Sequence, residues 1–402
     1  MGAVGKSIDK IIPVAKPLMD DREAAAARRA ILSGWVTQGP EVAAFEREFA
    51  AFVGCDFACA VSSCTTALHL ALLAVGVQAG HEVITVSHSF IATANSIRYC
   101  NAIPVFVDID PVTFNIDPGL VESAITQQTR AILAVHQMGM PCDILAVREI
   151  ASRHHLPLIE DAACAIGSEI EVGEKWERIG RPHGDIACFS FHPRKLLSTG
   201  DGGMVTCSNA HYDREFRLLR QHGMSVPDAV RHQARDVIFE DYPILGFNYR
   251  MTDIQAAIGR EQLKRLPEVL VRRRSLASRY QEKLKQVPGI RVPEEPTWAH
   301  SNWQSFCTYL PDHVDQRRVM QAMLDAGIST RRGVMCAHRE PAYGEASWYC
   351  GGGENRCSGP NCSHLKHSER AQDTTIILPL YHELTETDQD YIVEMLADAC
   401  RN

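Results

Sequence analysis

The sequence contains no hydrophobic run long enough to cross a lipid bilayer, and it carries no surplus of positive charge. Its 402 residues include 41 Lys and Arg against 49 Asp and Glu, which gives a formal net charge of −8 at pH 7. A membrane-spanning helix needs about 20 consecutive apolar residues, and binding to nucleic-acid phosphates requires a basic face. We therefore expect neither a membrane protein nor a nucleic-acid-binding protein.

The first residues also lack the apolar core of a secretory signal peptide, and Lys6 stands where a myristoylation site favours Ser or Thr. Most of the fourteen cysteines lie in apolar stretches, where cysteine packs as a small hydrophobic residue. We therefore expect reduced thiols and a cytoplasmic location. Hydrophobic residues make up 45% of the chain and charged residues 22%, which is typical of a globular protein.

Between about residues 41 and 210, short apolar segments alternate with helical patterns. Strands are predicted at 58–61, 82–86, 103–107, 131–135, 156–159 and 186–191. Helices are predicted at 41–53, 66–75, 91–100 and 144–154. Strands this apolar, separated by helices, are typical of a mostly parallel sheet with helices on both faces. The sequence thus predicts an α/β protein.

The pattern changes after about residue 255. Helices are predicted at 254–266, 269–287, 317–326 and 387–400, with sparser strands between them. We therefore expect an N-terminal arm (1–12), a large α/β domain (13–255) and a smaller C-terminal α+β domain (256–402). The Gly- and Cys-rich segment 350–363 is predicted to be a loop.

Polar features follow the predicted strands, at the edge where open α/β sheets bind their ligands. Ser-Ser-Cys-Thr-Thr at 62–66 opens a helix. Such a segment suits a phosphate held by backbone N–H groups, although an ordinary N-cap explains it equally well. Phe90 follows the strand that ends at residue 86 and is placed to stack on a flat ring. A phenylalanine in such a position is more often part of the core.

Two ionisable residues complete the pattern. Asp161 ends an apolar strand, where its carboxylate can hold a proton on a pyridine nitrogen; the alternative is a helix N-cap. Lys195 follows the buried strand 186–191 and precedes a Gly-rich turn at 200–203. This placement predicts a buried amine with a lowered pKa, which a Schiff base requires because only the neutral amine attacks an aldehyde.

The order of phosphate cradle, aromatic, Asp and Lys is that of pyridoxal phosphate enzymes with the aspartate aminotransferase fold. From about Pro13 to the C-terminus, the sequence most resembles the DegT/StrS-type sugar aminotransferases. The motifs that carry this resemblance are Gly-Trp-Val-Thr-Gln-Gly-Pro (34–40), Ala-Leu-His-Leu-Ala-Leu (67–72), Val-Phe-Val-Asp-Ile-Asp (105–110), Ser-Phe-His-Pro-Arg-Lys (190–195) and Gly-Phe-Asn-Tyr-Arg-Met-Thr (246–252).

The resemblance implies the cofactor pyridoxal 5′-phosphate and a role for each residue around it. Lys195 would form the internal aldimine and shuttle the proton, Asp161 would pair with the pyridine nitrogen, and Phe90 would stack on the ring. A Lys at position 195 also favours transamination, because relatives that dehydrate sugars carry a His there. Cys164 departs from the family pattern, which usually has Gln near the cofactor ring, and a thiol makes weaker hydrogen bonds than an amide.

The resemblance also implies how the phosphate is held. Cys64, Thr65 and Ser190 would bind it from the same subunit, and Asn248 would reach it from the neighbouring subunit. A homodimer with shared active sites is therefore expected.

The reaction implied is transfer of an amino group from glutamate, or from glutamine, to a keto carbon of a nucleotide-linked deoxysugar. Arg331 or Arg332 is expected to meet the diphosphate, because a guanidinium fork suits phosphate oxygens, and His382 is a candidate sugar contact. Two alternatives remain. One is a cyclitol aminotransferase that acts on a keto-inositol, and the other is a non-catalytic regulatory protein that binds pyridoxal phosphate.

The C-terminal part carries a group of potential zinc ligands, namely Cys336, His338, Cys350, Cys357, Cys362 and His364. The spacing Cys-x6-Cys-x4-Cys differs from the short Cys-x2–4-Cys spacing of structural zinc sites. The sequence therefore predicts no metal centre, with a zinc site as the minor alternative.

Overall fold

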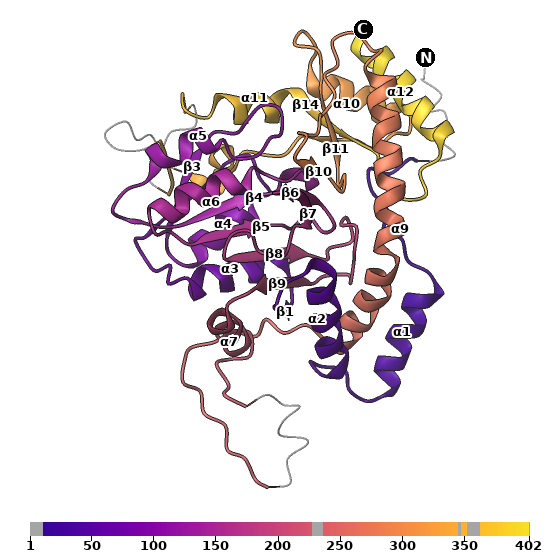
Figure 1. The fold of residues 1–402 in the computed structure, drawn as a ribbon. Coiled ribbons are helices and arrows are strands. Elements are labelled where there is room, and N and C mark those ends of the chain that lie inside the picture. The colour runs from indigo at the N-terminus through magenta and orange to yellow at the C-terminus, as the bar shows by residue number, and fades with distance from the viewer. Residues whose placement is uncertain (1–10, 227–235, 345–346, 352–361, 402) are drawn as a thin grey trace.

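The computed structural model describes residues 11–226, 236–344, 347–351 and 362–401. Its centre is an eight-stranded sheet with the strand order β1-β9-β8-β5-β4-β2-β3-β13 (Figure 1). Only β9 runs against the other strands of this sheet. The strands are β1 (Phe57–Val61), β2 (Glu82–Val86), β3 (Ile103–Val107), β4 (Thr129–Val135), β5 (Leu158–Asp161), β8 (Ile186–Ser190), β9 (Gly203–Cys207) and β13 (Tyr349–Cys350). The prediction of a mostly parallel α/β sheet is confirmed.

Helices cover both faces of this sheet because its strands are apolar on both faces. Successive side chains of a strand point to opposite faces, and in β4 Ile132 packs in one core cluster while Leu133 packs in the other. The first cluster includes side chains of α2, α6 and α9, and the second includes side chains of α3, α4 and α7. The helices are α1 (Asp21–Leu32), α2 (Pro40–Val53), α3 (Cys64–Ala74), α4 (Ala92–Tyr99), α5 (Pro118–Val121), α6 (Ile144–Arg153), α7 (Ala210–Leu219), α9 (Asp253–Leu284), α10 (Gln316–Asp325), α11 (Lys366–Thr374) and α12 (Glu386–Arg401).

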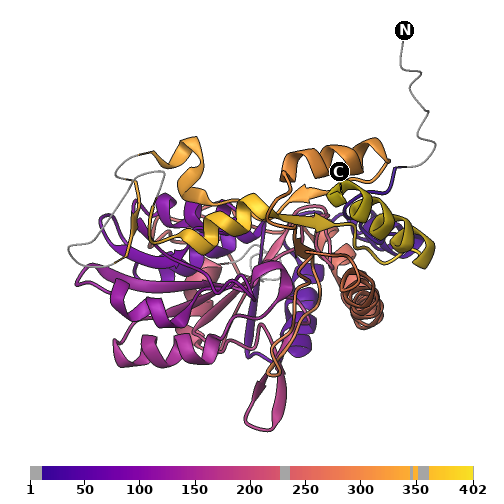
Figure 2. The ribbon, with the colours of Figure 1, turned by 90° about the horizontal axis from the view of Figure 1, so that it is seen from above.

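Two smaller antiparallel sheets flank the large one. The sheet β11-β14-β12 consists of β11 (Phe306–Tyr309), β14 (Thr375–Leu378) and β12 (Arg331–Arg332), and it shares a core with α10 and α12. The sheet β10-β6-β7 consists of β10 (Ala299–His300), β6 (Glu169–Val172) and β7 (Lys175–Arg178). The hairpin of β6 and β7 projects from the body of the molecule (Figure 2). The sequence did not indicate β6 and β7, since a hairpin with one buried residue in its two strands carries little apolar pattern.

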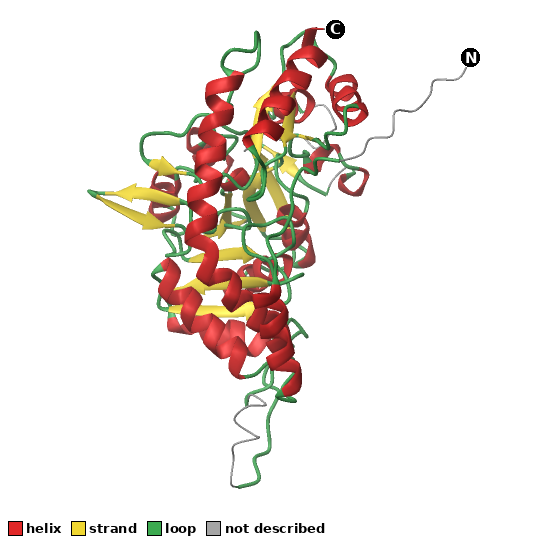
Figure 3. Cartoon of the chain, turned by 90° about the vertical axis from the view of Figure 1, so that its right-hand side faces the viewer, coloured by secondary structure: helices red, strands yellow, loops and turns green. Residues whose placement is uncertain are grey.

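The prediction of two helices at 254–266 and 269–287 is wrong, because α9 runs through both as one helix. Pro267 lies within it, and a proline removes one backbone hydrogen bond and usually ends or kinks a helix. Here Leu266 and Leu270, on either side of the proline, are both buried in the same core cluster. We infer that this continuous buried stripe outweighs the lost hydrogen bond. Figure 3 shows the long helix beside the sheet.

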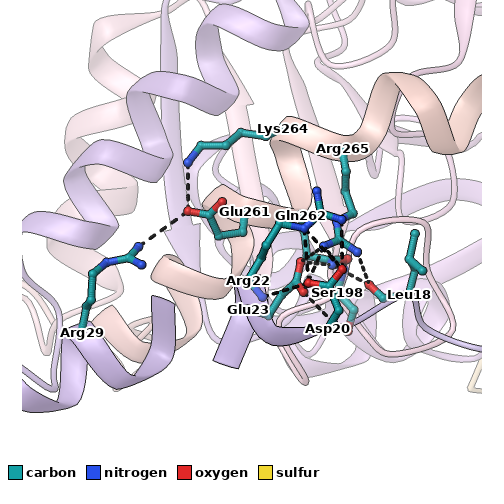
Figure 4. Close-up of polar contacts among 10 residues, drawn as sticks. All are labelled: Leu18, Asp20, Arg22, Glu23, Arg29, Ser198, Glu261, Gln262, Lys264 and Arg265. Atoms are coloured by element: carbon teal, nitrogen blue, oxygen red, sulfur yellow. Dashed lines mark hydrogen bonds and ion pairs between the residues drawn. The ribbon is translucent and has the colours of Figure 1, made fainter. Parts of the chain in front are cut away.

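Polar contacts fasten α9 to the N-terminal helix and to the turn that carries Lys195 (Figure 4). Arg265 is buried and lies 3.0 Å from Glu23 of α1, which is buried as well. One turn earlier, the Gln262 amide donates to Glu23 and accepts from the backbone N–H of Ser198. Ser198 follows Lys195 by three residues, so the long helix helps to fix the position of that turn.

The outermost strand, β13, comes from the C-terminal part of the chain and pairs in parallel with β3. Residues that the sequence assigns to the smaller domain thus extend the large sheet, and the domain boundary near residue 255 stays a prediction. Cys350 of β13 forms a disulfide with Cys362, so the expectation of reduced thiols is wrong for this pair. Burial explains the encounter, since both side chains pack in one apolar cluster with Trp348 and Leu365. None of the described helices has the length and hydrophobicity of a membrane span.

Candidate active site

A cavity of about 600 Å³ lies at the carboxyl ends of the central strands, between the large sheet and the strands β12 and β14. It brings together residues that are far apart in the sequence. Nine of the predicted site residues line the cavity, namely Cys64, Thr65, Phe90, Asp161, Cys164, Ser190, Lys195, Arg331 and Arg332. Asn248 and His382 do not line it.

One end of the cavity is formed by the N-terminus of α3. The hydroxyl of Ser63 caps this helix by accepting from the backbone N–H of Thr66 at 3.2 Å. The N–H groups of Cys64 and Thr65 belong to the first turn, which has no acceptor within the helix. The N-cap interpretation is therefore confirmed. The next two residues leave donors for an anion, and the phosphate interpretation stays a prediction.

A glycine opposite this helix allows the backbone segments to approach closely. A Cβ atom on Gly203, the first residue of β9, would lie 2.5 Å from the carbonyl carbon of Ser63. That contact is closer than any real Cβ makes, so only glycine fits without a shift of the cradle. The Gly-rich turn after Lys195 thus shapes the same end of the cavity.

Asp161 lies at the end of β5 with its carboxylate in the cavity. One carboxylate oxygen accepts from the Thr93 hydroxyl at 2.8 Å and the other from the backbone N–H of Ala163 at 3.1 Å. Burial raises the pKa of Asp161, and these two hydrogen bonds oppose the shift. A turn rather than a helix follows Asp161, so the N-cap alternative is wrong. Sequence reasoning missed Thr93 and its partner Ser89, 2.7 Å away, although both flank Phe90.

The neighbouring residue, Glu160, lies on the opposite face of β5 from Asp161 and holds the strand in place. Its carboxylate accepts from the backbone N–H groups of His183 and Gly184 and lies 2.9 Å from Nε2 of His136. Nδ1 of His136 accepts from the N–H of Cys142, so the ring proton is on Nε2 and is donated to Glu160. The backbone N–H of His136 also donates to the Asp161 carbonyl. This buried network sets the direction of the Asp161 carboxylate.

Lys195 lies in the turn after β8, and its amine donates to the sulfur of Cys164 at 2.9 Å. Burial lowers the pKa of the Lys195 ammonium, but Cys164, Cys64 and Asp161 raise it, and the net direction is upward. The prediction of a lowered pKa is therefore wrong for the protein without cofactor. The physical reason is that acidic groups from other elements surround the amine, and the sequence near Lys195 does not reveal them.

Phe90 is 63% exposed and lines the mouth of the cavity. The alternative that it belongs to the core is therefore wrong. An aromatic ring left this exposed beside a cavity has a face available for a flat ligand.

Three arginines lie at the mouth of the cavity, and they differ in their contacts. Arg332 is bound to Glu340 at 2.9 Å. Arg331 and Arg194 have no carboxylate partner among the residues that the structure describes. Burial and the nearby charge of Arg331 lower the pKa of Arg194, which shows that the two cations lie close together. Arg194 was not predicted, although it directly precedes Lys195.

The loop that contains Asn248 lies outside the cavity of its own chain. The Asn248 side chain accepts from Arg250 at 3.2 Å, and Tyr249 contacts His69 and the backbone N–H of Ser62. The loop is thereby fixed next to the phosphate end of the site, but Asn248 does not line the cavity of its own chain. His382 also lies elsewhere, with Nε2 4.0 Å from Glu268, so the structure does not support its role as a sugar contact.

Four of the candidate zinc ligands have other partners, and two of these, Cys350 and Cys362, form the disulfide. His338 lies between Ser87 at 2.6 Å and Glu369 at 3.0 Å, and the Cys336 thiol donates to the Ser368 carbonyl. Within the described parts of the chain, no group of three or more His, Cys, Asp or Glu side chains is arranged to hold a metal ion. Cys357 lies outside the described residues.

The model of the DegT/DnrJ/EryC1/StrS aminotransferase family matches residues 17–397. The chain belongs to this family. It is 35% identical over 391 residues to the spore coat polysaccharide biosynthesis protein SpsC of Bacillus subtilis (strain 168), with 96% of each chain covered. The family resemblance stated from the motifs is thus confirmed.

Solved structures agree with this assignment. The aminotransferase TlmJ from Streptoalloteichus hindustanus has a TM-score of 0.85 and 31% identity, with 97% of this chain and 98% of that chain covered. DesI, solved in the presence of its TDP-sugar product, has a TM-score of 0.84 and 28% identity, with 100% and 95% covered. The present chain is therefore a sugar aminotransferase of fold type I. Such enzymes are pyridoxal phosphate-dependent transaminases.

Proposed function

We propose that this aminotransferase moves an amino group from glutamate to a keto carbon of a nucleotide-linked deoxysugar, with pyridoxal 5′-phosphate bound in the cavity. The observation that carries the proposal is the convergence of the Lys195 amine, the Asp161 carboxylate and the free N–H groups of α3 in one cavity. SpsC is named for polysaccharide biosynthesis, and we propose the same kind of pathway here. We also propose a cytoplasmic location.

The cavity fits this cofactor at each of its functional groups. The N–H groups of Cys64 and Thr65, with the hydroxyl of Ser190, would hold the phosphate. Phe90 would lie on the ring, and Asp161 would pair with the pyridine nitrogen. Bound pyridoxal phosphate supplies an aldehyde and an electron-withdrawing ring.

The protein's own residues then control where protons lie. The ionised Asp161 favours a protonated pyridine nitrogen, and Thr93 helps to keep Asp161 ionised. The Lys195 amine, on its turn between Cys164 and the phosphate cradle, accepts and returns a proton at the substrate carbon. Sheet and cradle residues enclose these groups and limit the access of water.

Replacement of Lys195 tests the central claim. We expect Lys195→Ala to bind pyridoxal phosphate without the covalent link. The absorbance at about 420 nm, which this link produces, should then be lost. A spectrum identical to that of the unchanged protein would contradict the assignment. For the unchanged protein, retention of the cofactor without an amino-group half-reaction on glutamate would instead favour the regulatory alternative.

Arg194 and Arg331, which have no carboxylate partner in the described part of the chain, favour a nucleotide-linked sugar over a keto-inositol. A diphosphate needs cationic partners, whereas a cyclitol would leave Arg194 and Arg331 without an anion. DesI was solved with a TDP-sugar, which is consistent with such a substrate. Turnover of a keto-inositol, with no turnover of nucleotide keto-sugars, would support the cyclitol alternative.

Replacement of the two adjacent arginines at the mouth of the cavity should change the KM for the nucleotide sugar to different extents. Arg331→Ala should raise the KM for the nucleotide sugar about tenfold, since a charge-assisted contact contributes roughly 1.5–3 kcal/mol. Arg332→Ala is the matched control, and its effect should be smaller because Arg332 already binds Glu340. Steady-state kinetics with the sugar varied measures both. If neither variant changes the KM, the diphosphate contact is wrong.

We also propose a homodimer with shared sites. Asn248 does not line its own cavity, and the neighbouring segment 236–245, defined here as the arm, extends from the body beside α7 (Figure 1). Phe239 and Leu245 of the arm are each 88% exposed and Val237 is 84% exposed. Exposed apolar groups of this size are typical of protein interfaces, and a second copy of the chain would cover them.

A further inference from the structure

Cys164 and Lys195 form an unusually close pair of reactive side chains. The Cys164 sulfur and the Lys195 amine nitrogen are 2.9 Å apart, and both line the cavity. Among the described residues, the sulfur is the only hydrogen-bond partner of this amine.

The backbone on both sides holds the pair in place. The carbonyl of Cys164 accepts from the side chain of the fully buried Asn302 at 2.7 Å, and the same amide donates to the carbonyl of Ile166. On the other side, the backbone N–H of Lys195 donates to the His192 carbonyl at 2.8 Å. The two side chains therefore meet without a movement of either turn.

The surroundings of the pair favour reaction with an oxidant. The Cys164 sulfur lies at the cavity, where hydrogen peroxide can reach it, and peroxides convert a cysteine thiol to a sulfenic acid. The acidic groups around Lys195, with Cys164 first among them, raise the pKa of the ammonium. Oxidation of the Cys164 sulfur to a sulfenic acid removes the first of these contributions and so favours release of a proton from the amine.

We propose that Cys164 and Lys195 are a site of reversible oxidative crosslinking. Hydrogen peroxide oxidises the Cys164 thiol to a sulfenic acid and is itself reduced to water. The neutral Lys195 amine then attacks the sulfur, an S–N bond forms, the S–O bond breaks, and a second water molecule leaves with a proton from the amine. In sum, one thiol, one amine and one hydrogen peroxide give one sulfenamide and two waters.

Thiols reverse the crosslink. One thiol attacks the sulfur, which releases the Lys195 amine and leaves a mixed disulfide on Cys164, and a second thiol restores the Cys164 thiol. While the crosslink exists, the amine is not available to an aldehyde. Protection of Lys195 by bound pyridoxal phosphate is also expected, and this part alone rests on the proposed function.

Mass spectrometry of the protein freed of pyridoxal phosphate tests the proposal. After brief treatment with hydrogen peroxide, we expect a mass loss of about 2 Da, for the two hydrogens removed, and a peptide in which Cys164 is joined to Lys195. Dithiothreitol should restore the original mass. The Cys64→Ser variant should form the same crosslink, and Cys164→Ser should not form it, with near-ultraviolet circular dichroism as the check of folding.

Two results would overturn the proposal. One is a disulfide between Cys64 and Cys164, both of which are free thiols at the cavity in the structure. The other is a Cys164 oxidised to sulfinic or sulfonic acid with Lys195 unmodified. If the crosslink forms but added pyridoxal phosphate does not prevent it, the proposed cofactor role of Lys195 fails and the crosslink stands.

Discussion

At the scale of single residues, the hydrogen bond from Thr93 to Asp161 is the contact on which the state of the carboxylate most directly depends. Burial raises the pKa of Asp161, and the Thr93 hydroxyl, 2.8 Å away, opposes that shift. The ionised form is the one that pairs with a protonated pyridine nitrogen. Cofactor affinity should therefore fall as the pH falls through the pKa of Asp161.

The variant Thr93→Val keeps the side-chain shape and removes the donor. We expect the pKa of Asp161 to rise further, so that the loss of affinity on acidification begins at a higher pH. Loss of one hydrogen bond to a charged group, about 1.5 kcal/mol, should raise the Kd of pyridoxal phosphate roughly tenfold at neutral pH. Titrations followed by absorbance at several pH values measure both effects.

Ser89→Ala is the matched control for Thr93→Val. Ser89 contacts the Thr93 hydroxyl but not the carboxylate, so its effect should be several-fold smaller. Equal pH profiles for Thr93→Val and the unchanged protein would show that Thr93 does not influence Asp161.

At the scale of secondary-structure elements, a carboxylate of one helix caps another. The N-cap of α2 is Gly39, which has no side chain to accept a hydrogen bond. Asp253, the first residue of α9, accepts instead from the backbone N–H groups of Gly39 at 2.7 Å, Glu41 at 3.1 Å and Val42 at 3.0 Å. The contact joins segments more than two hundred residues apart, which the local sequence does not indicate.

Replacement of Asp253 should therefore destabilise the whole fold. Asp253→Ala leaves buried N–H groups without an acceptor, and we expect the free energy of unfolding to fall by about 2–3 kcal/mol. Asp117→Ala is the control, since Asp117 caps only the short helix α5 through the N–H of Gly119 and should cost about 1 kcal/mol or less. Equilibrium unfolding in urea measures both, and equal values would refute the interhelical cap.

At the scale of the whole molecule, the exposed arm and the net charge bear on assembly and on substrate binding. The net charge of −8 gives an anionic substrate no general attraction, so a favourable field must come from the local cations Arg194 and Arg331. The apolar side chains of the arm are left exposed by the residues that the structure describes, and this exposure favours a dimer.

The double variant Phe239→Asp and Leu245→Asp tests the dimer. The dimer would bury these two apolar side chains, and each burial contributes roughly 1.5–3 kcal/mol. Charges in their place should therefore weaken self-association by more than about tenfold. Sedimentation velocity measures the shift to monomer, and a parallel loss of cofactor affinity is expected if Asn248 acts across the interface. Leu324→Asp, on α10 at the opposite end of the molecule (Figure 1), is the control. A dimer unaffected by the double variant would contradict the arm's role.

The sequence by itself determined six of the eight strands of the large sheet and nine of the residues that line the cavity. Six strands were predicted close to their observed bounds, because a strand covered on both faces must be a short apolar run. The phosphate cradle, Phe90, Asp161 and Lys195 were predicted as well, since each lies at the end of a strand or within five residues after it. The topology of a parallel sheet brings these strand ends to one edge.

Only the tertiary structure decided which partners these residues have. The raised pKa of Lys195, the hydrogen bond from Thr93 to Asp161 and the pairing of Arg332 with Glu340 depend on the distances between side chains from different elements. The continuous helix through Pro267 was decided in the same way, by packing against neighbours. Local patterns record which face of a segment is buried, but the energy of a contact between distant residues is set by the fold that brings them together.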